Sequence, residues 1–394
     1  MRILHLYSDW KWTGPAEPAL QMCKSLEDRG HDVLIAYCTA PIAEAETMAI
    51  KVKEYGVQGT EQFALDRHIP PLKTLRDTVT LPRFISRKKF DVVHMHLSHD
   101  HAFGAILTKL LGRNRPQLVR TLHRRTVLEP NMGNRLQLKA LADGFLTFTE
   151  GFRQQYITEY GLDPERIAVQ PMSVDLERFT PERTHVCKRA SFGIAADAPV
   201  IGIVGRYQKY RHADVFLEAA AKVLAEVPEA RFIVIGDSGQ MQETVVAPMK
   251  RLGIEHAVVL PGYLMDDYDD VMASLDIFSL LMPGFDGTAR AVREAMALGL
   301  PCVVSDFGML PDIVPHEEAG LVCNVDADQL AAAWLRLIRN EDERNALGAG
   351  ALASARSRFH IDAVGPCLEQ FYERLITLNR GDAKKPKAPT LPPK

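Results

Sequence analysis

The feature that most constrains this chain is a repeated alternation between short apolar segments and segments with helical periodicity. Near the N-terminus the apolar runs are "RILHLY", "DVLIAYC" and "DVVHMHL", and residues 17–29 and about 101–112 read as helices. The alternation begins again near residue 198 with "PVIGIVG", "RFIVIGD", "LDIFSLLMP" and "PCVVSD". Buried strands that alternate with helices are typical of parallel sheets covered on both faces. The sequence therefore predicts an α/β protein with two Rossmann-like domains that face each other across a cleft.

The same pattern predicts where the domains begin and end. A chain of 394 residues is too long for one typical core. We expect an N-terminal domain over residues 1–185 and a C-terminal domain over residues 186–358. The last helical stretch, about 359–378, has no strand after it and is expected to pack back on the N-terminal domain. The tail, 380–394, is basic and rich in proline, a composition typical of disorder.

Composition narrows the class of protein. The formal net charge of -3 argues against a nucleic-acid-binding protein, which usually has a basic excess. No apolar run is long enough to span a membrane, the first residues lack a signal peptide's apolar stretch, and the six cysteines form no C-x-x-C pair. We expect a cytoplasmic protein without a nucleic-acid partner. The basic segments "RFISRKKF" and "HRRTVLEPNMGNR" permit peripheral contact with the inner face of a membrane, and a solvated face explains them at least as well.

One short stretch, "DGTARAVREAMALGLP" at residues 286–301, combines a loop acid, a turn of small residues, a cation and a helical acid. It follows a predicted strand, and a helix is expected to begin near Thr288. Free N–H groups and the positive end of the helix dipole favour an anion such as phosphate there. Gly287 allows the backbone to approach the ligand closely, and Arg290, one turn into the helix, adds a charge-assisted hydrogen bond.

Two acids flank this predicted anion site. Glu294 lies four residues after Arg290 on the same helix face, and its carboxylate can accept hydrogen bonds from a ribose diol. Asp286 precedes the helix and can accept hydrogen bonds from the group beyond the phosphates. The motif therefore fits a sugar, a diphosphate and a ribose in that order. Taken alone, it also fits a capped surface helix with a solvated Arg290–Glu294 pair.

The loops after other predicted strands contain residues that could bind the same ligand. Arg206 and Arg211 follow the strand "PVIGIVG", which ends at Gly205, and two cations at this edge complement a diphosphate. In "LPGY", Tyr263 and the Leu264 that follows it provide an apolar edge for a nucleobase.

Together these segments resemble the family-four retaining glycosyltransferases of the GT-B fold. The order "VGR", "VIGD", "LPGY", "DGTARAVREAMALGLPCVVSDFG" and "LPDIV" is similar to that family's second domain, which has an acid–seven residues–acid motif at this place. "SDWKWTGPAEPALQMCKSLEDRGHDV", with Gly14, is similar to the family's glycine loop and first helix, and "FDVVHMH" to its histidine-bearing strand. "PMSVDLERF" is similar to the segment that leads to the second domain. The resemblance covers roughly residues 1–378.

The resemblance implies transfer of a sugar from a nucleotide diphosphate donor to a hydroxyl of a saccharide or lipid-linked acceptor, with retention at the anomeric carbon. Such transfers serve polysaccharide, lipopolysaccharide or glycolipid synthesis at the cell surface. Arg206, Arg211 and Arg290 would stabilise the leaving diphosphate. The departing phosphate oxygen can take the acceptor's proton, so no protein nucleophile, metal or cofactor is expected. The other donor-side residues implied are Gly14, Gly205, Tyr263, Leu264, Gly287, Thr288, Ala289 and Glu294.

The sequence departs from the family's pattern mainly in the sugar pocket. Asp286 occupies a position where the family usually has glutamate, and Thr288-Ala289 followed by Arg290 replaces the usual Gly-Phe-Gly. The positions expected to bind the phosphates still carry basic residues. Two alternatives to transfer are therefore a nucleotide-sugar epimerase on the same fold and a non-catalytic nucleotide-sugar binder.

The segment "HMHLSHDH", residues 94–101, is rich in histidine. It is similar to the H-x-H-x-D-H motif of metallo-β-lactamase-like hydrolases, but Ser98 stands where that motif has its aspartate. Serine does not bind a divalent metal as a carboxylate does, so we expect no metal site.

A different role follows for these histidines. His94 and His96 share one face of the predicted strand, and His96 is nearer its carboxyl end and the cleft. In the resembled family a histidine at this place meets the donor sugar or the acceptor, and we assign that catalytic role to His96. His94, His99 and Arg124 are assigned to the acceptor side. The alternatives are a hydrogen-bonded position inside the sheet for His94 and a solvated or capping role for His99.

Overall fold

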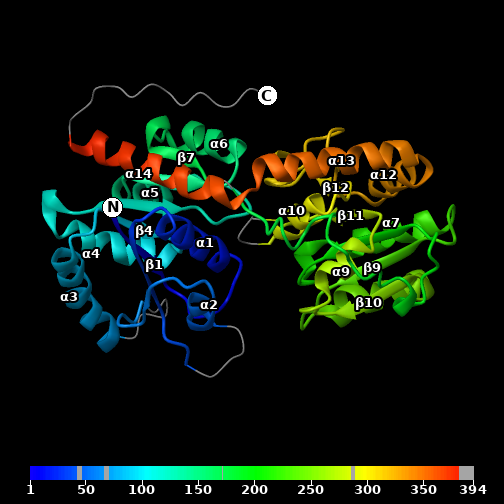
Figure 1. Ribbon diagram of the computed structural model, residues 1–394, viewed down its shortest axis with the longest axis horizontal. Coiled ribbons are helices and arrows are strands. Elements are labelled where there is room, and N and C mark those ends of the chain that lie inside the picture. The colour runs from blue at the N-terminus through cyan, green and yellow to red at the C-terminus, as the bar shows by residue number, and fades with distance from the viewer. Residues whose placement is uncertain (42–46, 66–70, 171, 285–288, 381–394) are drawn as a thin grey trace.

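The computed structural model describes residues 1–41, 47–65, 71–170, 172–284 and 289–380. Figure 1 shows two lobes side by side, each built around a sheet with helices on both faces. Every pair of neighbouring strands in the two sheets is parallel.

The N-terminal sheet has seven strands in the order β3-β2-β1-β4-β5-β6-β7. Its strands are β1 (Arg2–Tyr7), β2 (Asp32–Tyr37), β3 (Gly59–Thr60), β4 (Val92–Met95), β5 (Gln117–Thr121), β6 (Gly144–Thr147) and β7 (Ile167–Val169). The helices of this half are α1 (Ala16–Glu27), α2 (Met48–Glu54), α3 (Pro71–Lys88), α4 (Ala105–Lys109), α5 (Met132–Leu141) and α6 (Glu150–Tyr160).

The C-terminal sheet has six strands in the order β10-β9-β8-β11-β12-β13. Its strands are β8 (Val200–Val204), β9 (Arg231–Ile235), β10 (Val258–Gly262), β11 (Ile277–Leu280), β12 (Cys302–Ser305) and β13 (Gly320–Cys323). The helices are α7 (Ala213–Leu224), α8 (Ala247–Leu252), α9 (Tyr268–Ala273), α10 (Arg290–Ala297), α11 (Leu310–Ile313), α12 (Ala327–Arg339) and α13 (Glu341–Arg358). Short helical turns of both halves are η1 (Asp100–Gly104), η2 (Gly112–Asn114), η3 (Pro164–Arg166), η4 (Ala190–Phe192), η5 (Lys209–Arg211), η6 (Gln242–Val246), η7 (Glu255–Ala257) and η8 (Ile361–Ala363).

Both sheets reverse their strand order beside the first strand, between β1 and β4 and between β8 and β11. This is the Rossmann topology, in which a crevice for ligands lies outside the carboxyl ends of the strands at the reversal. The predicted fold class, two Rossmann-like domains, is therefore confirmed.

The alternation of side chains explains why both faces of each sheet are covered. In β1, Ile3 and Tyr7 belong to one core cluster with α1, whereas Leu4 and Leu6 belong to another with α3 and α4. Successive residues of a strand point to opposite faces, so a strand with apolar residues at every position must be buried on both sides.

The carboxyl-end loops of the two sheets contact each other. The guanidinium of Arg125, after β5, lies 4.4 Å from the ring centre of Tyr210 in η5. Gly308, after β12, approaches so closely that a Cβ there would lie 2.5 Å from the carbonyl oxygen of Arg125. The two crevices therefore face each other across one interface.

The last helix, α14 (Val364–Arg380), returns to the N-terminal lobe, where it lies beside α1 (Figure 1). Glu369 of α14 pairs with Arg29 and lies 3.1 Å from Nε2 of His31. Gly144 in β6 makes room for this helix, since a Cβ there would meet the side chain of Leu375 at 2.4 Å. Within the described residues, no helix is both long enough and apolar enough to cross a membrane.

Candidate active site

The helix α10, which follows β11, carries the acid of the motif that was predicted to hold a ribose. Glu294 is 2% exposed, and each of its carboxylate oxygens accepts one hydrogen bond. Tyr268 donates its hydroxyl to Oε2 at 2.7 Å, and Arg290 donates Nε to Oε1 at 2.7 Å. Burial, together with this carboxylate, raises the pKa of Tyr268 well above its ordinary value, so the phenol remains a donor.

Arg290 also reaches across the interface between the domains. Its Nη1 lies 3.0 Å from Oε2 of Glu17, in the first turn of α1. Burial alone would lower the pKa of this guanidinium, but the carboxylates of Glu294 and Glu17 raise it above its ordinary value. The cation that the sequence assigned to the donor phosphates is thus paired with two carboxylates in this structure.

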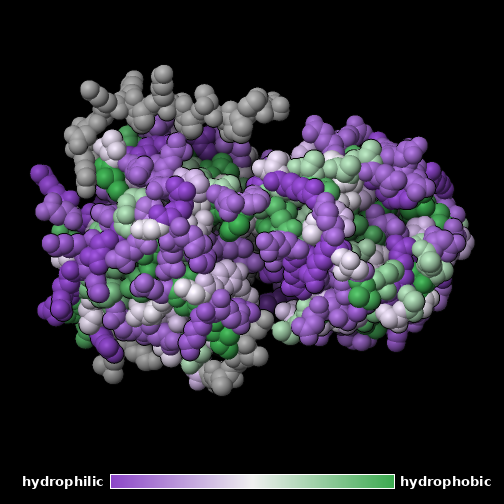
Figure 2. All heavy atoms as spheres, in the orientation of Figure 1, coloured by the Kyte–Doolittle hydropathy of each residue, from purple (hydrophilic) through white to green (hydrophobic). Residues whose placement is uncertain are grey.

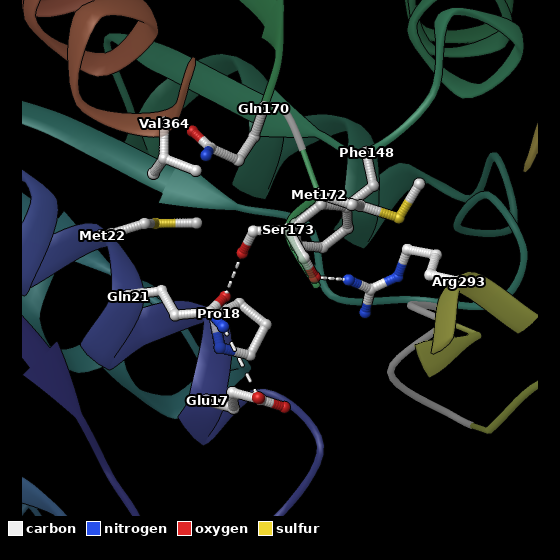
Figure 3. A pocket seen from close by; sticks show the side chains of 10 residues that line it. All are labelled: Glu17, Pro18, Gln21, Met22, Phe148, Gln170, Met172, Ser173, Arg293 and Val364. Atoms are coloured by element: carbon white, nitrogen blue, oxygen red, sulfur yellow. Dashed lines mark hydrogen bonds between the residues drawn. The ribbon is translucent and has the colours of Figure 1, made fainter. Parts of the chain in front are cut away.

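A second arginine of α10 strengthens the link to the N-terminal domain. Arg293 is buried and donates Nη1 to the carbonyl of Ser173, in the segment between the two sheets. Ser173 in turn donates Oγ to Gln21 of α1 at 2.6 Å, and Gln21 contacts Glu17 (Figure 3). These residues line a small pocket at the junction of the domains. The position of α10 is therefore tied directly to α1 and to the interdomain segment.

The turn before α10 has an unusual backbone. Ala289, the residue before the helix, has φ 45° and ψ 46°, which is the left-handed region. A side chain with a Cβ is strained there, whereas glycine is not. This position lies where the resembled family has its small Gly-Phe-Gly turn. Asp286, Gly287 and Thr288, which were predicted to contact the sugar and the phosphates, lie outside the described residues.

The two predicted phosphate-binding cations follow β8. Arg206 is exposed, and its guanidinium has no hydrogen-bond or ion-pair partner within the part of the chain that the structure describes. Arg211 donates Nη1 to the carbonyl of Met282, two residues after the end of β11, at 2.5 Å. Its guanidinium carbon lies 3.8 Å from the position that a Cβ of Gly205 would take. Arg211 is therefore held at the strand reversal, while Arg206 is free to meet a ligand.

A glycine at the end of β9 shapes this edge. Gly236 has φ 117°, and a Cβ there would lie 2.2 Å from the carbonyl oxygen of Gly205. Only glycine allows both that backbone conformation and that approach. Beyond β10, Tyr263 is 68% exposed and Leu264 is half-buried. An exposed aromatic ring at the carboxyl edge offers a surface on which a planar base can stack.

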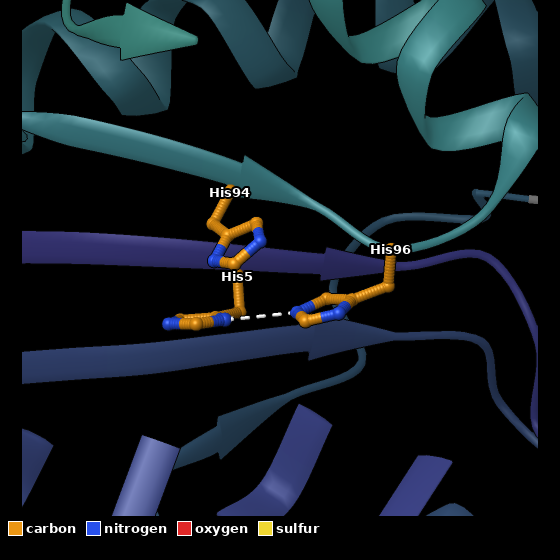
Figure 4. Close-up of side chains that lie close together, drawn as sticks. All are labelled: His5, His94 and His96. Atoms are coloured by element: carbon orange, nitrogen blue, oxygen red, sulfur yellow. Dashed lines mark hydrogen bonds between the residues drawn. The ribbon is translucent and has the colours of Figure 1, made fainter. Parts of the chain in front are cut away.

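The histidine-rich strand lies opposite, in the N-terminal domain. His5 of β1 pairs in register with His94 of β4, so the two rings share one face of the sheet, and His96 lies on the same face (Figure 4). Burial lowers the pKa of His94 and His96 well below the ordinary value, and that of His5 to about 3. All three imidazoles are therefore neutral.

His94 is engaged on both sides inside the core. Its Nδ1 is 2.7 Å from the hydroxyl of Tyr372 in α14, and its Nε2 is 2.7 Å from Oγ1 of Thr121. A neutral imidazole has one donor and one acceptor nitrogen, and both are used here. The structure therefore gives His94 the hydrogen-bonded position inside the sheet and corrects its assignment to the acceptor side.

His96 is also buried, at 1% exposure, and is the middle member of a hydrogen-bonded row. Its Nε2 lies 2.9 Å from Nδ1 of His5, and its Nδ1 lies 3.3 Å from Nε2 of His123. The expectation that His96 itself borders the cleft therefore does not hold in this structure. His123, which follows β5 and is only half-buried, ends the row at the carboxyl edge of the sheet. His123 was not among the predicted site residues, although it begins the basic segment "HRRTVLEPNMGNR" and lies two residues after the end of β5.

The other predicted acceptor-side residues lie near this edge. His99 is half-buried, and its ring stacks on that of Phe103 at 5.6 Å. Arg124 is half-buried, and its Nε is enclosed without a hydrogen-bond partner among the described residues. Gly14 is exposed in the turn before α1, next to Thr13, whose Oγ1 lies 2.8 Å from the hydroxyl of Tyr7.

Two clusters among the described residues have the composition of a metal site. One is His5, His94 and His96, in which every ring nitrogen except Nε2 of His5 already takes part in a hydrogen bond given above. The other is His185, Asp269 and Asp270. Asp269 pairs with Arg178 at 2.8 Å and with Arg183 at 3.2 Å, so its charge is already balanced by cations. Neither cluster contains a residue that was predicted to bind the nucleotide part of the donor.

Two Rossmann-like sheets whose carboxyl ends face each other have the architecture of a GT-B glycosyltransferase. The family model described as "Glycosyltransferase Family 4" matches residues 14–178, and the family model described as "Glycosyl transferases group 1" matches residues 187–353. The chain belongs to the family-four retaining glycosyltransferases. It is an enzyme that moves a sugar from a nucleotide diphosphate donor to an acceptor hydroxyl.

Individual relatives are distant. The UDP-Gal:alpha-D-GlcNAc-diphosphoundecaprenol alpha-1,3-galactosyltransferase of Escherichia coli is 25% identical over 285 residues, which cover 69% of this chain and 73% of that protein. The N-acetyl-alpha-D-glucosaminyl L-malate synthase of Bacillus anthracis is 25% identical over 291 residues, 73% of this chain and 75% of that protein. The crystal structure of Anabaena HepE in complex with UDP superimposes with a TM-score of 0.77 at 20% identity, over 95% of this chain and 100% of that chain.

Proposed function

We propose that this transferase uses a UDP-linked sugar and an acceptor that is lipid-linked and carries a phosphate or diphosphate. The Escherichia coli relative is named for a UDP-galactose donor and a diphosphoundecaprenol acceptor, and HepE was crystallised with UDP. The proposal transfers both properties to this chain, and the following contacts support it.

The observation that carries the proposal is the free guanidinium of Arg206 at the strand reversal of the C-terminal sheet. It is exposed and has no anionic partner within the described ranges, whereas the neighbouring Arg211 is fixed by the carbonyl of Met282. An exposed, unpaired cation beside one that is held in place suits a diphosphate whose negative charge grows as the sugar leaves. Glu294 would hold the ribose through the lone pairs that Tyr268 and Arg290 leave unused, and Tyr263 with Leu264 would border the base.

On the acceptor side, Arg124 supports an anionic substrate. Its charge acts on that of Arg120, a buried arginine of β5 whose Nη1 hydrogen-bonds to Nδ1 of His101. Buried cations without an ion-pair partner are costly, so an anion that enters this edge would be stabilised. We assign the acceptor's phosphate to Arg124, and contact with a sugar hydroxyl to His123 in place of His96.

The proposed donor site is tested by calorimetric titration of Arg206→Ala with UDP and with uridine. Because the cation meets phosphate and not base, UDP affinity should fall roughly tenfold to a hundredfold while uridine affinity stays unchanged. Arg251→Ala removes an exposed cation of α8 and serves as the matched control. Equal losses for UDP and uridine would refute the assignment.

The role proposed for Asp286, contact with the donor sugar, is separable from capping of α10. Asp286→Ala and Asp286→Asn should both lower turnover strongly and leave UDP affinity nearly intact. If Asp286 is only a cap, asparagine replaces it without loss, and alanine costs about 1 kcal/mol of stability.

Two other functions and the expected metal independence have simple tests. An epimerase would convert the nucleotide sugar without an acceptor, and a non-catalytic binder would bind the donor without turnover across acceptors. We propose that neither occurs and that transfer survives removal of divalent ions by EDTA and dialysis. Loss of transfer that one divalent ion restores would revive a metal site.

A further inference from the structure

The outer side of the N-terminal domain combines unpaired cations with exposed apolar side chains. α3 and α4 pack against each other and cover the same face of the sheet, where Leu81, Ile85, Ala105 and Leu107 share one core cluster. Figure 1 shows the two helices at the end of the N-terminal lobe that points away from the C-terminal domain. Their remaining sides therefore face outward from the sheet.

Each helix exposes a pair of apolar residues one turn apart. On α3 these are Leu75, 65% exposed, and Val79, 43% exposed. The pair at α4 is Ile106, 50% exposed, and Leu110, 73% exposed, which is the residue that ends the helix. Residues at i and i+4 lie on one helix face, so each pair forms a short apolar ridge. In Figure 2 the left edge of the molecule, over these helices, mixes hydrophobic and strongly hydrophilic residues.

The charges around the ridges have one sign. The exposed cations of α3 and of the loops that follow α3 and α4 are Arg76, Arg83, Arg87, Lys88, Lys89 and Arg113. None of them has an ion-pair partner among the described residues, whereas exposed cations elsewhere, such as Arg336 and Arg356, pair with acids. The one acid between residues 75 and 89, Asp77, is buried and accepts a hydrogen bond from the backbone N–H of Leu65.

An open groove continues this basic surface and is lined in part by Lys89, Lys109 and Arg113. Its two acids are both engaged. Asp143 pairs with Arg115 at 2.6 Å, and Asp91 accepts a hydrogen bond from the backbone of Arg2 at 2.8 Å. The groove therefore carries a net positive charge, since its lining has four cations, Lys89, Lys109, Arg113 and Arg115, and two acids, Asp91 and Asp143.

α5 extends the surface toward the proposed acceptor site. It contacts η1, directly before α4, and it follows the loop that bears His123 and Arg124. Met132 and Leu136 of α5 are 87% and 70% exposed, and the helix contains no acid. A partner that covers α3 and α4 would thus reach the edge where the acceptor enters.

We infer that this face, the outer side of α3, α4 and α5, docks on an anionic lipid bilayer. The inference rests on the proposed lipid-linked acceptor. Apolar side chains flanked by cations, with no exposed acid on α3, α4 or α5 among the described residues, match an interface in which side chains enter the acyl boundary and cations meet lipid phosphates. A folded partner protein would need acids facing the cations, and a nucleic acid would leave the apolar ridges in water.

The test is co-sedimentation of the full chain with vesicles of equal parts phosphatidylglycerol and phosphatidylcholine, and with vesicles of phosphatidylcholine alone. The chain should bind the anionic vesicles only. Removing three cations in the variant Arg83→Gln, Arg87→Gln, Lys88→Gln should weaken that binding about a hundredfold. The matched control, Lys250→Gln, Arg251→Gln, Arg339→Gln, removes three exposed cations of the C-terminal domain and should bind as the unmodified chain does.

A second pair of variants tests insertion. Leu75→Ser with Leu110→Ser should weaken binding at least tenfold, and Val186→Ser with Ile361→Ser, which changes exposed apolar residues elsewhere, should not. Binding that is lost with the charges but kept without Leu75 and Leu110 would overturn docking on a bilayer in favour of a water-exposed polyanion. No binding by the unmodified chain would also overturn it.

Transfer to a water-soluble acceptor analogue separates this inference from the proposed function. The variants of α3 and α4 should keep that activity, because none of these residues contacts the donor or acceptor sites. Vesicle binding without any transfer would contradict the proposed acceptor and leave the docking face standing.

Discussion

Arg290, the first residue of α10, makes an ion pair with Glu17 of α1 in the opposite domain, with 3.0 Å between Nη1 and Oε2. Through Nε the same guanidinium holds Glu294, the acid proposed to bind the ribose. A donor diphosphate would compete with Glu17 for this cation. We therefore propose that the pair couples donor binding to the contact between the domains.

We expect Glu17→Gln to bind UDP about two- to fivefold more tightly. The substitution releases Arg290 from a partly exposed ion pair, and such pairs contribute at most about 1 kcal/mol. Calorimetric titration with UDP measures the change. Glu54→Gln, which removes an exposed carboxylate paired with Lys51 in α2, is the control and should leave UDP affinity unchanged.

A double-mutant cycle shows whether this gain passes through Arg290. In an Arg290→Leu background, Glu17→Gln should have no effect on UDP affinity, because the competing pair no longer exists. The same gain in both backgrounds would mean that Glu17 acts on the donor by another route.

The two histidines of the hydrogen-bonded row should respond differently to substitution. His96→Ala should lower the free energy of unfolding by roughly 2 kcal/mol or more, because it leaves a cavity and takes a partner from His5 and from His123. His123→Gln should lower turnover at least tenfold with little change in stability, as loss of one substrate hydrogen bond implies. Urea unfolding and a transfer assay on both variants decide the matter. The opposite pattern would place His96 at the substrate.

The left-handed conformation of Ala289 predicts that Ala289→Gly stabilises the protein by about 1 kcal/mol. Ala291, two residues later in the helical part of α10, is the matched control, and Ala291→Gly should destabilise it by about 1 kcal/mol. Urea unfolding measures the change in the free energy of unfolding for each variant, which should be positive for Ala289→Gly and negative for Ala291→Gly. Destabilisation by both would mean that Ala289 is not left-handed in solution.

Buried neutral histidines make the stability fall in acid. Burial lowers the pKa of His5 and His123 to about 3 and that of His94 and His96 well below its ordinary value. The unfolded chain takes up protons near pH 6.5, so the free energy of unfolding falls as the pH drops from about 6.5 toward 3, by up to about 1.4 kcal/mol per pH unit for each histidine. Asp100 acts in the opposite direction. Burial raises its pKa to about 7, so below that pH the folded chain binds a proton there before the unfolded chain does.

Urea unfolding at several pH values between neutral and about pH 5 measures this slope. His5→Gln removes one titrating ring and should make the slope shallower by roughly the contribution of one histidine. A free energy of unfolding that stays constant over this range would contradict the buried neutral row.

The order of strands and helices could be predicted from the sequence because each strand is buried on both faces. Strands such as "RILHLY" and "PVIGIVG" are therefore nearly continuous apolar runs, and the loops that follow them meet at one edge of a parallel sheet. That is why Arg206 and Arg211 were found at the strand reversal.

Contacts between the domains could not be predicted in this way. The periodicity of α10 places Arg290 beside Glu294, but it carries no information on which part of the other domain approaches, so the pair with Glu17 was missed. Likewise, period two puts His94 and His96 on one face, but it does not reveal that Tyr372 of α14 covers that face. His94, a predicted site residue, therefore lies in the core, because α14 at the end of the chain packs over it.

Transfer itself is tested most directly by the anomeric configuration of the product. The purified chain is incubated with UDP-sugars and a lipid-linked diphosphate acceptor, and the anomeric proton coupling of the isolated product is measured by NMR. We predict that donor is consumed only when acceptor is present, and that the new glycosidic bond has the configuration of the donor. An inverted bond, or a new nucleotide sugar formed without acceptor, would contradict a retaining transferase.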